Sequence, residues 1–243
     1  MTELTLEGIS NIQGDFQCKD YFYVKEFVMP FIRVAGNMTI ALNSGSVNTE
    51  AEIEFPNLLE IGGTLTLENN KNANNITFPS LKKILGSCSV TTSHLKNDIE
   101  FTNLESIGTD GANAQIKFEI DGTNILCPKL KTINGKFDIT TSTVIFDMEA
   151  DQVSYPNVES ISENLSITCP YSDFGSNGIL SIDFSGLKSV KGISISGQGD
   201  VTDFSSFKYL FENNVLTGES QWSVRECAYN PTYQDMKNGK YKQ

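Results

Sequence analysis

The sequence predicts an all-β fold, a right-handed parallel β-helix or solenoid with capped ends, made of repeats of about 20–29 residues. The main observation is self-similarity: the stretch from Ile53 to Leu67 (IEFPNLLEIGGTLTL) returns from Ile76 to Val90 (ITFPSLKKILGSCSV). A repeat of this length that tolerates insertions is typical of a solenoid, in which each unit buries its apolar side only against its neighbours. The position of Phe55 recurs at intervals of 20 to 29 residues, and we call these positions anchors. The anchors are Leu6, Val28, Phe55, Phe78, Phe101, Cys127, Tyr155, Phe184 and Phe204.

Each repeat predicts two short strands joined by a corner. Apolar and polar residues alternate strictly in Leu65–Leu67 and in Ile53–Phe55, which is the pattern of a strand with one buried face. Leu58 and Ile61, three and six residues after the anchor, are expected to share one face of a helix-like turn. Pro56 cannot donate a ladder hydrogen bond, so it ends the strand that carries the anchor. One coil therefore contributes a Leu65-type strand to a first parallel sheet and an Ile53-type strand to a second.

The repeats are predicted to span residues 4–210 of one solenoid domain, 1–243. Solenoid ends expose apolar surface and open strand edges, so both ends need caps. The aromatic-rich segment 20–27 is expected to be a helical insertion, and 205–213 a short helix that begins a C-terminal cap over 205–243. Loops between coils often carry specificity. They are expected at 108–115, 141–151 and 170–179.

The charge balance argues against two classes of partner. The chain carries 18 basic and 30 acidic side chains, a formal net charge of −12. Such a surface repels phosphate backbones and anionic lipids, so we predict no nucleic-acid partner and no binding to membrane surfaces. No apolar run approaches the ~20 residues that span a bilayer, so no membrane-spanning segment is expected. Residues 1–6 lack the basic and apolar regions of a signal peptide.

The cysteines predict no metal site, no cofactor and no disulfide framework. The sequence has no CxxC motif, and its cysteines form no ligand-like cluster. The five cysteines are Cys18, Cys88, Cys127, Cys169 and Cys227. Three of the cysteines occupy apolar positions of the repeat, so we interpret the cysteines as small buried hydrophobic side chains. Metal or redox chemistry is the alternative. Cys18 and Cys227 lie near opposite ends of the predicted rod, so a disulfide between them is not expected.

His94 is the only histidine, so a histidine-based triad or a multi-histidine metal site within the chain is excluded. Glu54 and Glu100 face outward two coils apart, ~9.6 Å by strand spacing, at the upper limit of the roughly 6.5–9.5 Å used by inverting glycosidases. Thr77 lies between them and no basic or aromatic residue marks a sugar subsite, so we interpret the acids as a solvated face. The acidic stretch 147–151 offers oxygens that suit calcium, but we interpret it as an acidic loop. The outward acids of the second sheet are Glu54, Glu100, Asp183 and Asp203.

The outward face of the first sheet is the preferred binding surface. Its hydroxyl groups can hydrogen-bond a glycan or another protein, although Ser and Thr are also ordinary on solvent-facing strands. The middle residue of each strand faces outward. In chain order these residues are Gln17, Thr39, Thr66, Ser89, Lys117, Asp138, Ser166 and Ser194. The predicted ligand-binding residues among them are Thr39, Thr66, Ser89, Ser166 and Ser194.

The pattern Ile-x-Phe-Pro-x-Leu-x-x-Ile-Gly-Gly-x-Leu-x-Ile, which several consecutive repeats carry, resembles the receptor L-domain family. That leucine-rich-repeat-like β-helix occurs in growth-factor-receptor ectodomains and in fungal cell-wall proteins. The chain is also similar to leucine-rich-repeat surface proteins of gut Bacteroidetes. The tail Cys227–Gln243 (CAYNPTYQDMKNGKYKQ) resembles the ending of Bacteroidetes surface lipoproteins.

The resemblance implies a non-enzymatic recognition or adhesion module that binds a glycan or protein ligand. It implies an exported protein at the cell surface or anchored to the outer membrane, with a signal that lies outside this sequence. We expect a monomer without a cofactor. The alternatives are a β-helix enzyme that degrades polysaccharide, as a lyase or a hydrolase, and a structural spacer without a ligand.

Overall fold

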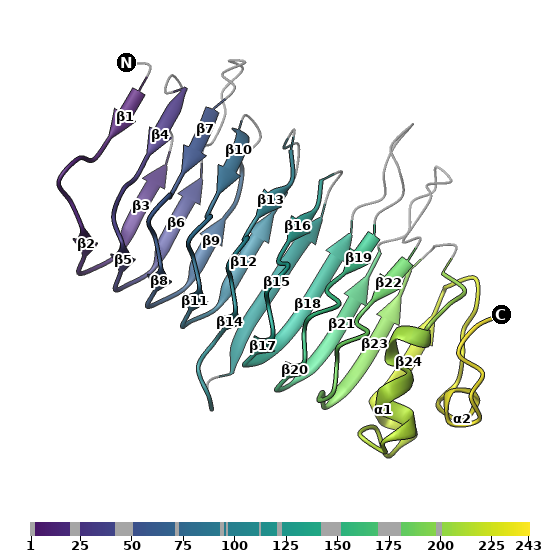
Figure 1. Ribbon diagram of the computed structural model, residues 1–243. Helices are drawn as coiled ribbons and strands as arrows, with labels where there is room; N and C mark the ends of the chain where they lie inside the picture. Colours follow the sequence, from purple (N-terminus) through teal and green to yellow (C-terminus); the bar gives the residue numbers. More distant parts are fainter. Residues whose placement is uncertain are drawn as a thin grey trace.

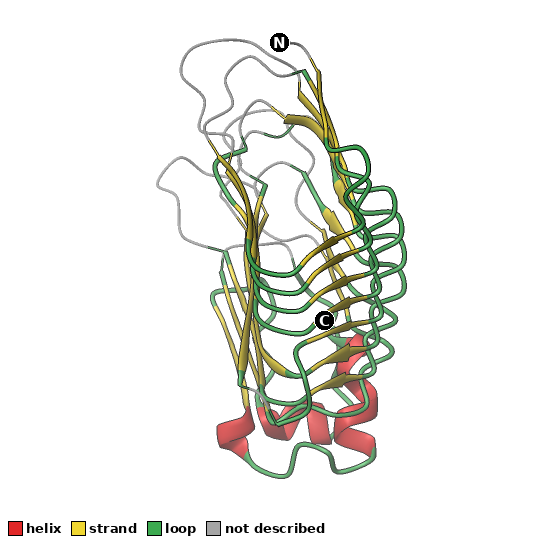
Figure 2. Ribbon diagram, turned by 90° about the vertical axis from the view of Figure 1, so that its left-hand side faces the viewer, coloured by secondary structure: helices red, strands yellow, loops and turns green. Residues whose placement is uncertain are grey.

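The computed structural model shows an all-β parallel solenoid, which confirms the predicted fold class. Successive coils stack in layers from the N-terminal end to the C-terminal end, where the helices gather (Figure 1, Figure 2). Three rows of strands run along the stack, and we call them the first, second and third face. The structure describes residues 3–19, 25–41, 51–70, 73–92, 95, 97–111, 113–120, 123–141, 152–169, 181–197 and 201–243.

The first face is a parallel sheet of nine strands and corresponds to the predicted first sheet. Its strands alternate as expected: Leu65 and Leu67 are buried, and Thr66 between them is half-buried. In spatial order the strands are β3 (Phe16–Lys19), β6 (Met38–Ala41), β9 (Leu65–Leu67), β12 (Cys88–Thr91), β15 (Ala114–Ile120), β18 (Gly135–Thr141), β21 (Asn164–Thr168), β23 (Gly192–Ser196) and β24 (Trp222–Arg225).

The second face corresponds to the predicted second sheet, but it is interrupted. A parallel sheet of six strands ends at Leu126, and a separate sheet of two strands begins at Gln152. The six strands are β1 (Glu3–Thr5), β4 (Glu26–Val28), β7 (Ala51–Glu54), β10 (Ala73–Thr77), β13 (Ile99–Glu100) and β16 (Ile125–Leu126). The two further strands are β19 (Gln152–Ser154) and β22 (Ser181–Asp183).

The corner between these faces contains a third sheet, so the expectation of two sheets is wrong. The predicted turn is present, and the Leu58 N–H donates to the Phe55 carbonyl at 3.4 Å. Glu60 and Ile61 are extended rather than helical, because their backbone groups then find partners in the neighbouring coils. The strands of this third face are β2 (Asn11–Ile12), β5 (Arg33–Val34), β8 (Glu60–Ile61), β11 (Lys83–Ile84), β14 (Ser106–Ile107), β17 (Thr132–Ile133) and β20 (Ser160–Ile161).

Aromatic anchors form the centre of the core. Phe55 and Phe78 stack with ring centroids 5.0 Å apart, and Phe78 and Phe101 stack at 5.1 Å. All three side chains are fully buried. The repeat therefore places large apolar rings directly above one another, which joins the coils into one continuous hydrophobic core.

Cys127 interrupts this aromatic row, and residues of the first face fill the space that a smaller anchor leaves. Phe118 and Phe137 lie 5.1 Å apart and approach Tyr155 at 6.0 and 5.5 Å between centroids. A small residue on one sheet is thus matched by large residues on the opposite sheet. This exchange of volume keeps the interior close-packed through the middle of the solenoid.

The prediction of Val28 as an anchor is wrong. Val28 is half-buried and pairs with the outward-facing Glu54, whereas Met29 is buried. Val34 pairs with Ile61, so the later part of the two coils is in the expected register. The corner that follows Met29 is one residue shorter than in the other repeats. Counting back from Val34 by the usual six residues therefore reaches Val28 instead of Met29.

The C-terminal end carries a compact cap. Short helices cover residues 205–212 of the segment 205–213, where the sequence predicts a helix. Trp222 packs edge-on against Phe211 with centroids 5.1 Å apart, and its indole N–H donates to the Pro231 carbonyl at 2.9 Å. The helical elements are η1 (Ser205–Phe207), α1 (Lys208–Glu212), η2 (Glu219–Gln221) and α2 (Tyr233–Lys237).

The prediction of a helical insertion over 20–27 is wrong for the described end of that segment, because Glu26–Val28 form strand β4. Residues 20–24 lie outside the described part of the chain. None of the helices among the described residues has the length and apolar character needed to cross a membrane.

Candidate functional site

A continuous row of outward side chains crosses the first face. The backbone registers place all five predicted binding residues in it. Ser223 of β24 extends the row beyond the prediction. It was missed because β24 lies in the tail, outside the repeat, although the alternation in Trp222-Ser223-Val224 is a strand signal. In order, the row is Gln17, Thr39, Thr66, Ser89, Lys117, Asp138, Ser166, Ser194 and Ser223.

The middle of this face is charged. Lys136 Nζ lies 2.8 Å from Asp138 Oδ1, and Lys117 forms an ion pair with Glu119. The hydrogen bond from Lys117 is the main reason why the pKa of Glu119 lies below its usual value; burial opposes this, and the Thr91 hydroxyl at 2.8 Å supports it. A band of paired charges therefore separates two hydroxyl-bearing halves of the face.

The hydroxyl-bearing positions have the geometry of a repeated polar surface. Neighbouring strands are ~4.8 Å apart, so the side chains of Thr39, Thr66 and Ser89 follow one another at that interval. Each hydroxyl can donate one hydrogen bond and accept others. The five hydroxyl-bearing side chains are all half-buried: Thr39, Thr66 and Ser89 before the charged band, and Ser166 and Ser194 after it. Chemically, the row can bind polar ligands through these hydroxyl groups.

The acids considered for catalysis fall into two separate groups. The registers confirm that Glu54, Thr77 and Glu100 lie on successive strands, and both glutamates are exposed. This agrees with their interpretation as a solvated face. Asp183 and Asp203 do not continue the stripe, because the second face is interrupted between β16 and β19.

A hollow of about 350 Å³ lies at this interruption. Leu126, 38% exposed, contributes apolar surface to it. At the same interruption, the buried Tyr155 hydroxyl donates to the carbonyl of Ile125 at 3.1 Å. The hollow is lined by Glu100, Thr102, Leu126, Cys127, Pro128, Ser154, Pro156 and Asn157.

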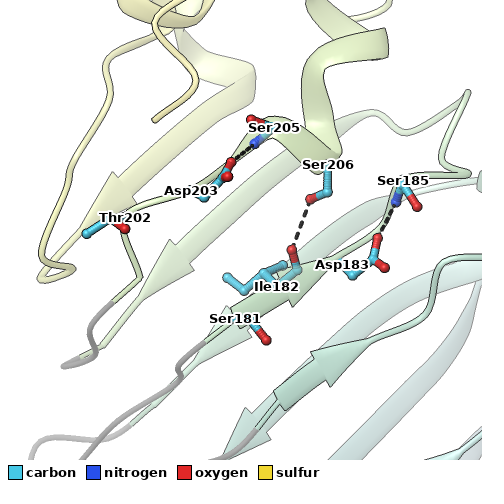
Figure 3. Close-up of a pocket in the computed structure, with 8 residues that line it drawn as sticks. All are labelled: Ser181, Ile182, Asp183, Ser185, Thr202, Asp203, Ser205 and Ser206. Atoms are coloured by element: carbon cyan, nitrogen blue, oxygen red, sulfur yellow. Dashed lines mark hydrogen bonds between the residues drawn. The ribbon is translucent and has the colours of Figure 1, made fainter. Parts of the chain in front are cut away.

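A larger hollow of about 470 Å³ lies where the solenoid meets its cap, and we call it the terminal cavity (Figure 3). One wall is strand β22 and the other is the segment Thr202–Ser206. The Ser206 hydroxyl crosses between them and donates to the Ile182 carbonyl at 3.1 Å. The lining residues are Ser181, Ile182, Asp183, Ser185, Thr202, Asp203, Ser205 and Ser206.

Both aspartates of the terminal cavity are held by local turns. Asp183 Oδ1 accepts the Ser185 N–H at 2.9 Å, and Asp203 Oδ1 accepts the Ser205 N–H at 2.7 Å. Burial disfavours ionisation of Asp203, but hydrogen bonds from the Ser205 side chain and backbone, together with the charge of Lys242, hold its pKa below the usual value. The cavity therefore presents carboxylates and hydroxyl groups, and none of its lining residues is basic.

The remaining candidates lie elsewhere. His94 and the acidic stretch 147–151 are outside the described residues. Within the described part of the chain, no group of three or more His, Cys, Asp or Glu is placed to hold a metal ion. The predicted burial of the cysteines is confirmed for all except Cys227, which is half-buried. Burial raises the pKa of Cys18 to about 11, so this thiol stays protonated at neutral pH and is a poor nucleophile.

No protein-family model, no curated protein and no solved structure matches this chain. A fold by itself does not define a function, since one scaffold can host many activities. The functional proposal therefore depends on the surface chemistry of the first face and of the terminal cavity.

Proposed function

We propose that this chain is a non-enzymatic recognition or adhesion module of the receptor L-domain type, displayed at the cell surface, that binds a glycan or protein ligand through its first face. The observation that supports this most is the row from Gln17 to Ser223, to which each of nine adjacent strands contributes one outward side chain. The strands are fixed by a buried core on their other side. Binding therefore orders few backbone groups, which lowers its entropic cost.

The side chains of the row suit repeated weak contacts. Thr66 and Ser89 are short, so they lose little rotamer freedom when a ligand binds. A hydrogen bond of this kind contributes only about 0.5–1.5 kcal/mol, so useful affinity needs several neighbouring contacts. A row that crosses the whole sheet provides such neighbours for an extended ligand.

Binding of the full chain to a broad glycan array and to surface-protein extracts tests the proposal, with the same polymers examined for cleavage. The double variant Thr66→Arg/Ser89→Arg replaces two hydroxyl groups of the row with bulky cations, and we expect binding at least tenfold weaker. Thr77→Arg is the matched control, because Thr77 is also half-buried and lies in the same coil as Ser89 but on the second face. We expect this control to bind normally.

Each outcome bears on a different part of the proposal. Normal binding by Thr66→Arg/Ser89→Arg would contradict the first face as the binding surface. Cleavage of a polymer would contradict the non-enzymatic role and favour a β-helix enzyme. The absence of any ligand would favour a structural spacer.

A further inference from the structure

We infer that the terminal cavity binds one sugar residue, or a polyol of similar size, that carries no acidic group. This inference deepens the proposed recognition function and rests on it, but it assigns a site away from the first face. The volume of about 470 Å³ falls within the roughly 300–1,000 Å³ of small-molecule sites. The cavity thus has room for one ring of a glycan.

The cavity exists because the last coil pairs with the end of the chain. The Phe204 N–H donates to the Tyr241 carbonyl at 2.8 Å, and the Gln243 N–H donates to the Thr202 carbonyl at 3.1 Å. This pairing is antiparallel, as the bridge between Asp203 and Lys242 shows. No ladder joins β22 to the segment 202–204, although both belong to the described part of the chain. A gap remains at the position where preceding coils pair strand to strand.

The two walls of the gap carry the same short motif in successive coils. Asp183-Phe184-Ser185 and Asp203-Phe204-Ser205 each place a carboxylate before a fully buried phenylalanine. The buried ring fixes the backbone, and the serine N–H then fixes one carboxylate oxygen at 2.9 and 2.7 Å, respectively. Both acceptors are therefore oriented before a ligand arrives, which reduces the cost of binding.

The chemistry of the lining selects the class of ligand. Carboxylates accept strong, charge-assisted hydrogen bonds from hydroxyl or amino groups, and the serine and threonine hydroxyls both donate and accept. The lining holds no basic residue, and its two aspartates outnumber the one cation that acts on Asp203, Lys242, so the cavity repels an anion. The net charge of −12 adds to this repulsion. A divalent cation is a poorer fit, because the described residues hold no group of three or more acidic, cysteine or histidine ligands. Neutral sugars and amino sugars match these features.

The test is a calorimetric and NMR titration of the full chain with methyl glycosides of neutral hexoses and hexosamines. Methyl glycosides of uronic acids are the matched anionic ligands, and calcium chloride tests the cation. We expect saturable binding of at least one neutral or amino sugar, with shifts at Ser181 and Thr202, and at least tenfold weaker binding of the uronic acid. Asp183→Asn/Asp203→Asn should weaken sugar binding at least tenfold. An asparagine Oδ1 still accepts the serine N–H, so the turns and the thermal midpoint should be retained.

Asp98→Asn is the control, because Asp98 Oδ1 also accepts a backbone N–H, from Asn124 at 2.7 Å, but lies outside the cavity and outside the first-face row. It should leave sugar binding unchanged. The inference is overturned if no sugar binds, if calcium alone gives a response, or if the double aspartate variant binds sugar normally. If Asp183→Asn/Asp203→Asn binds the glycan array normally and Thr66→Arg/Ser89→Arg loses binding, the cavity assignment fails and the recognition function stands. If the aspartate variant loses binding and the arginine variant binds normally, the first face is excluded as the binding surface and the cavity is retained.

Discussion

The buried hydroxyl of Tyr155 donates a hydrogen bond to the backbone carbonyl of Ile125, 3.1 Å away in the preceding coil. This bond crosses the interruption of the second face, where β16 and β19 lie in adjacent coils without pairing. Burial raises the pKa of Tyr155 well above its usual value, and the neighbouring Cys127 and Cys88 add to the effect, so the hydroxyl remains a donor. A side chain thus supplies the hydrogen bond that a strand would otherwise provide.

Tyr155→Phe should lower the free energy of unfolding by about 1–3 kcal/mol, because it leaves a buried carbonyl without its donor. Urea denaturation followed by circular dichroism measures the change. Tyr209→Phe is the control, since the Tyr209 side chain is 42% exposed and its loss of a hydroxyl should have little effect. Equal stability of the two variants would show that the bond to Ile125 does not stabilise the fold.

Phe78→Ala should cost about 3–5 kcal/mol, because it removes the middle ring of an aromatic stack and leaves a cavity. The stack holds Phe78 between rings at 5.0 and 5.1 Å. Thr77→Ala, at the preceding residue, which ends β10 and faces outward, should cost less than about 1 kcal/mol. Equilibrium unfolding in guanidinium chloride compares them, and a loss below ~1 kcal/mol for Phe78→Ala would contradict the register of the core.

Gly135→Ala should destabilise the protein by about 1–3 kcal/mol through overpacking between coils. A Cβ at Gly135 would lie 2.0 Å from the Ala114 carbonyl oxygen, and that oxygen belongs to the backbone of a paired strand. Gly218→Ala is the control, because a Cβ there meets no atom within 4 Å. A lower thermal midpoint for Gly135→Ala alone is expected, and an unchanged midpoint would mean that the coils lie further apart.

The C-terminal cap should loosen in acid as Asp235 is protonated. Hydrogen bonds from the Thr232 side chain, Lys240 and the Thr232 backbone lower the pKa of Asp235 from 3.8 to about 2. Because the folded pKa is depressed, this carboxylate contributes stability fully above pH ~4 and loses that contribution as the pH falls toward ~2. NMR titration of the Asp235 side chain should give a midpoint near 2, and Thr232→Ala should raise it. A midpoint near the ordinary value in the unmodified chain would contradict the capping geometry.

Strand alternation is a local property, which explains why the sequence alone predicted so much of the core. Ile53, Phe55, Leu65 and Leu67 are buried as the two-residue period requires, and the intervening side chains face outward. The outward row of the first face follows from the same pattern. The failure at Val28 has an equally local cause, because the corner after Met29 has one residue fewer than the others. Counting back at the usual spacing therefore assigns the side chains of the preceding strand to the wrong face, whereas Phe27 and Met29 are buried.

The third sheet, the interruption after β16 and the terminal cavity depend on contacts between segments far apart in the chain. Extended backbone at Glu60–Ile61 is stabilised by the coils on either side, which the residues of one corner do not reveal. Asp183 and Asp203 share a cavity because the last three residues pair with the final coil. Sequence by itself determined the parallel solenoid and the inward or outward direction of its strands, since both follow from short-range periodicity. Tertiary structure alone decided where strands pair, where the ladder stops and which polar side chains meet, because backbone pairing between distant segments leaves no mark on local residue types.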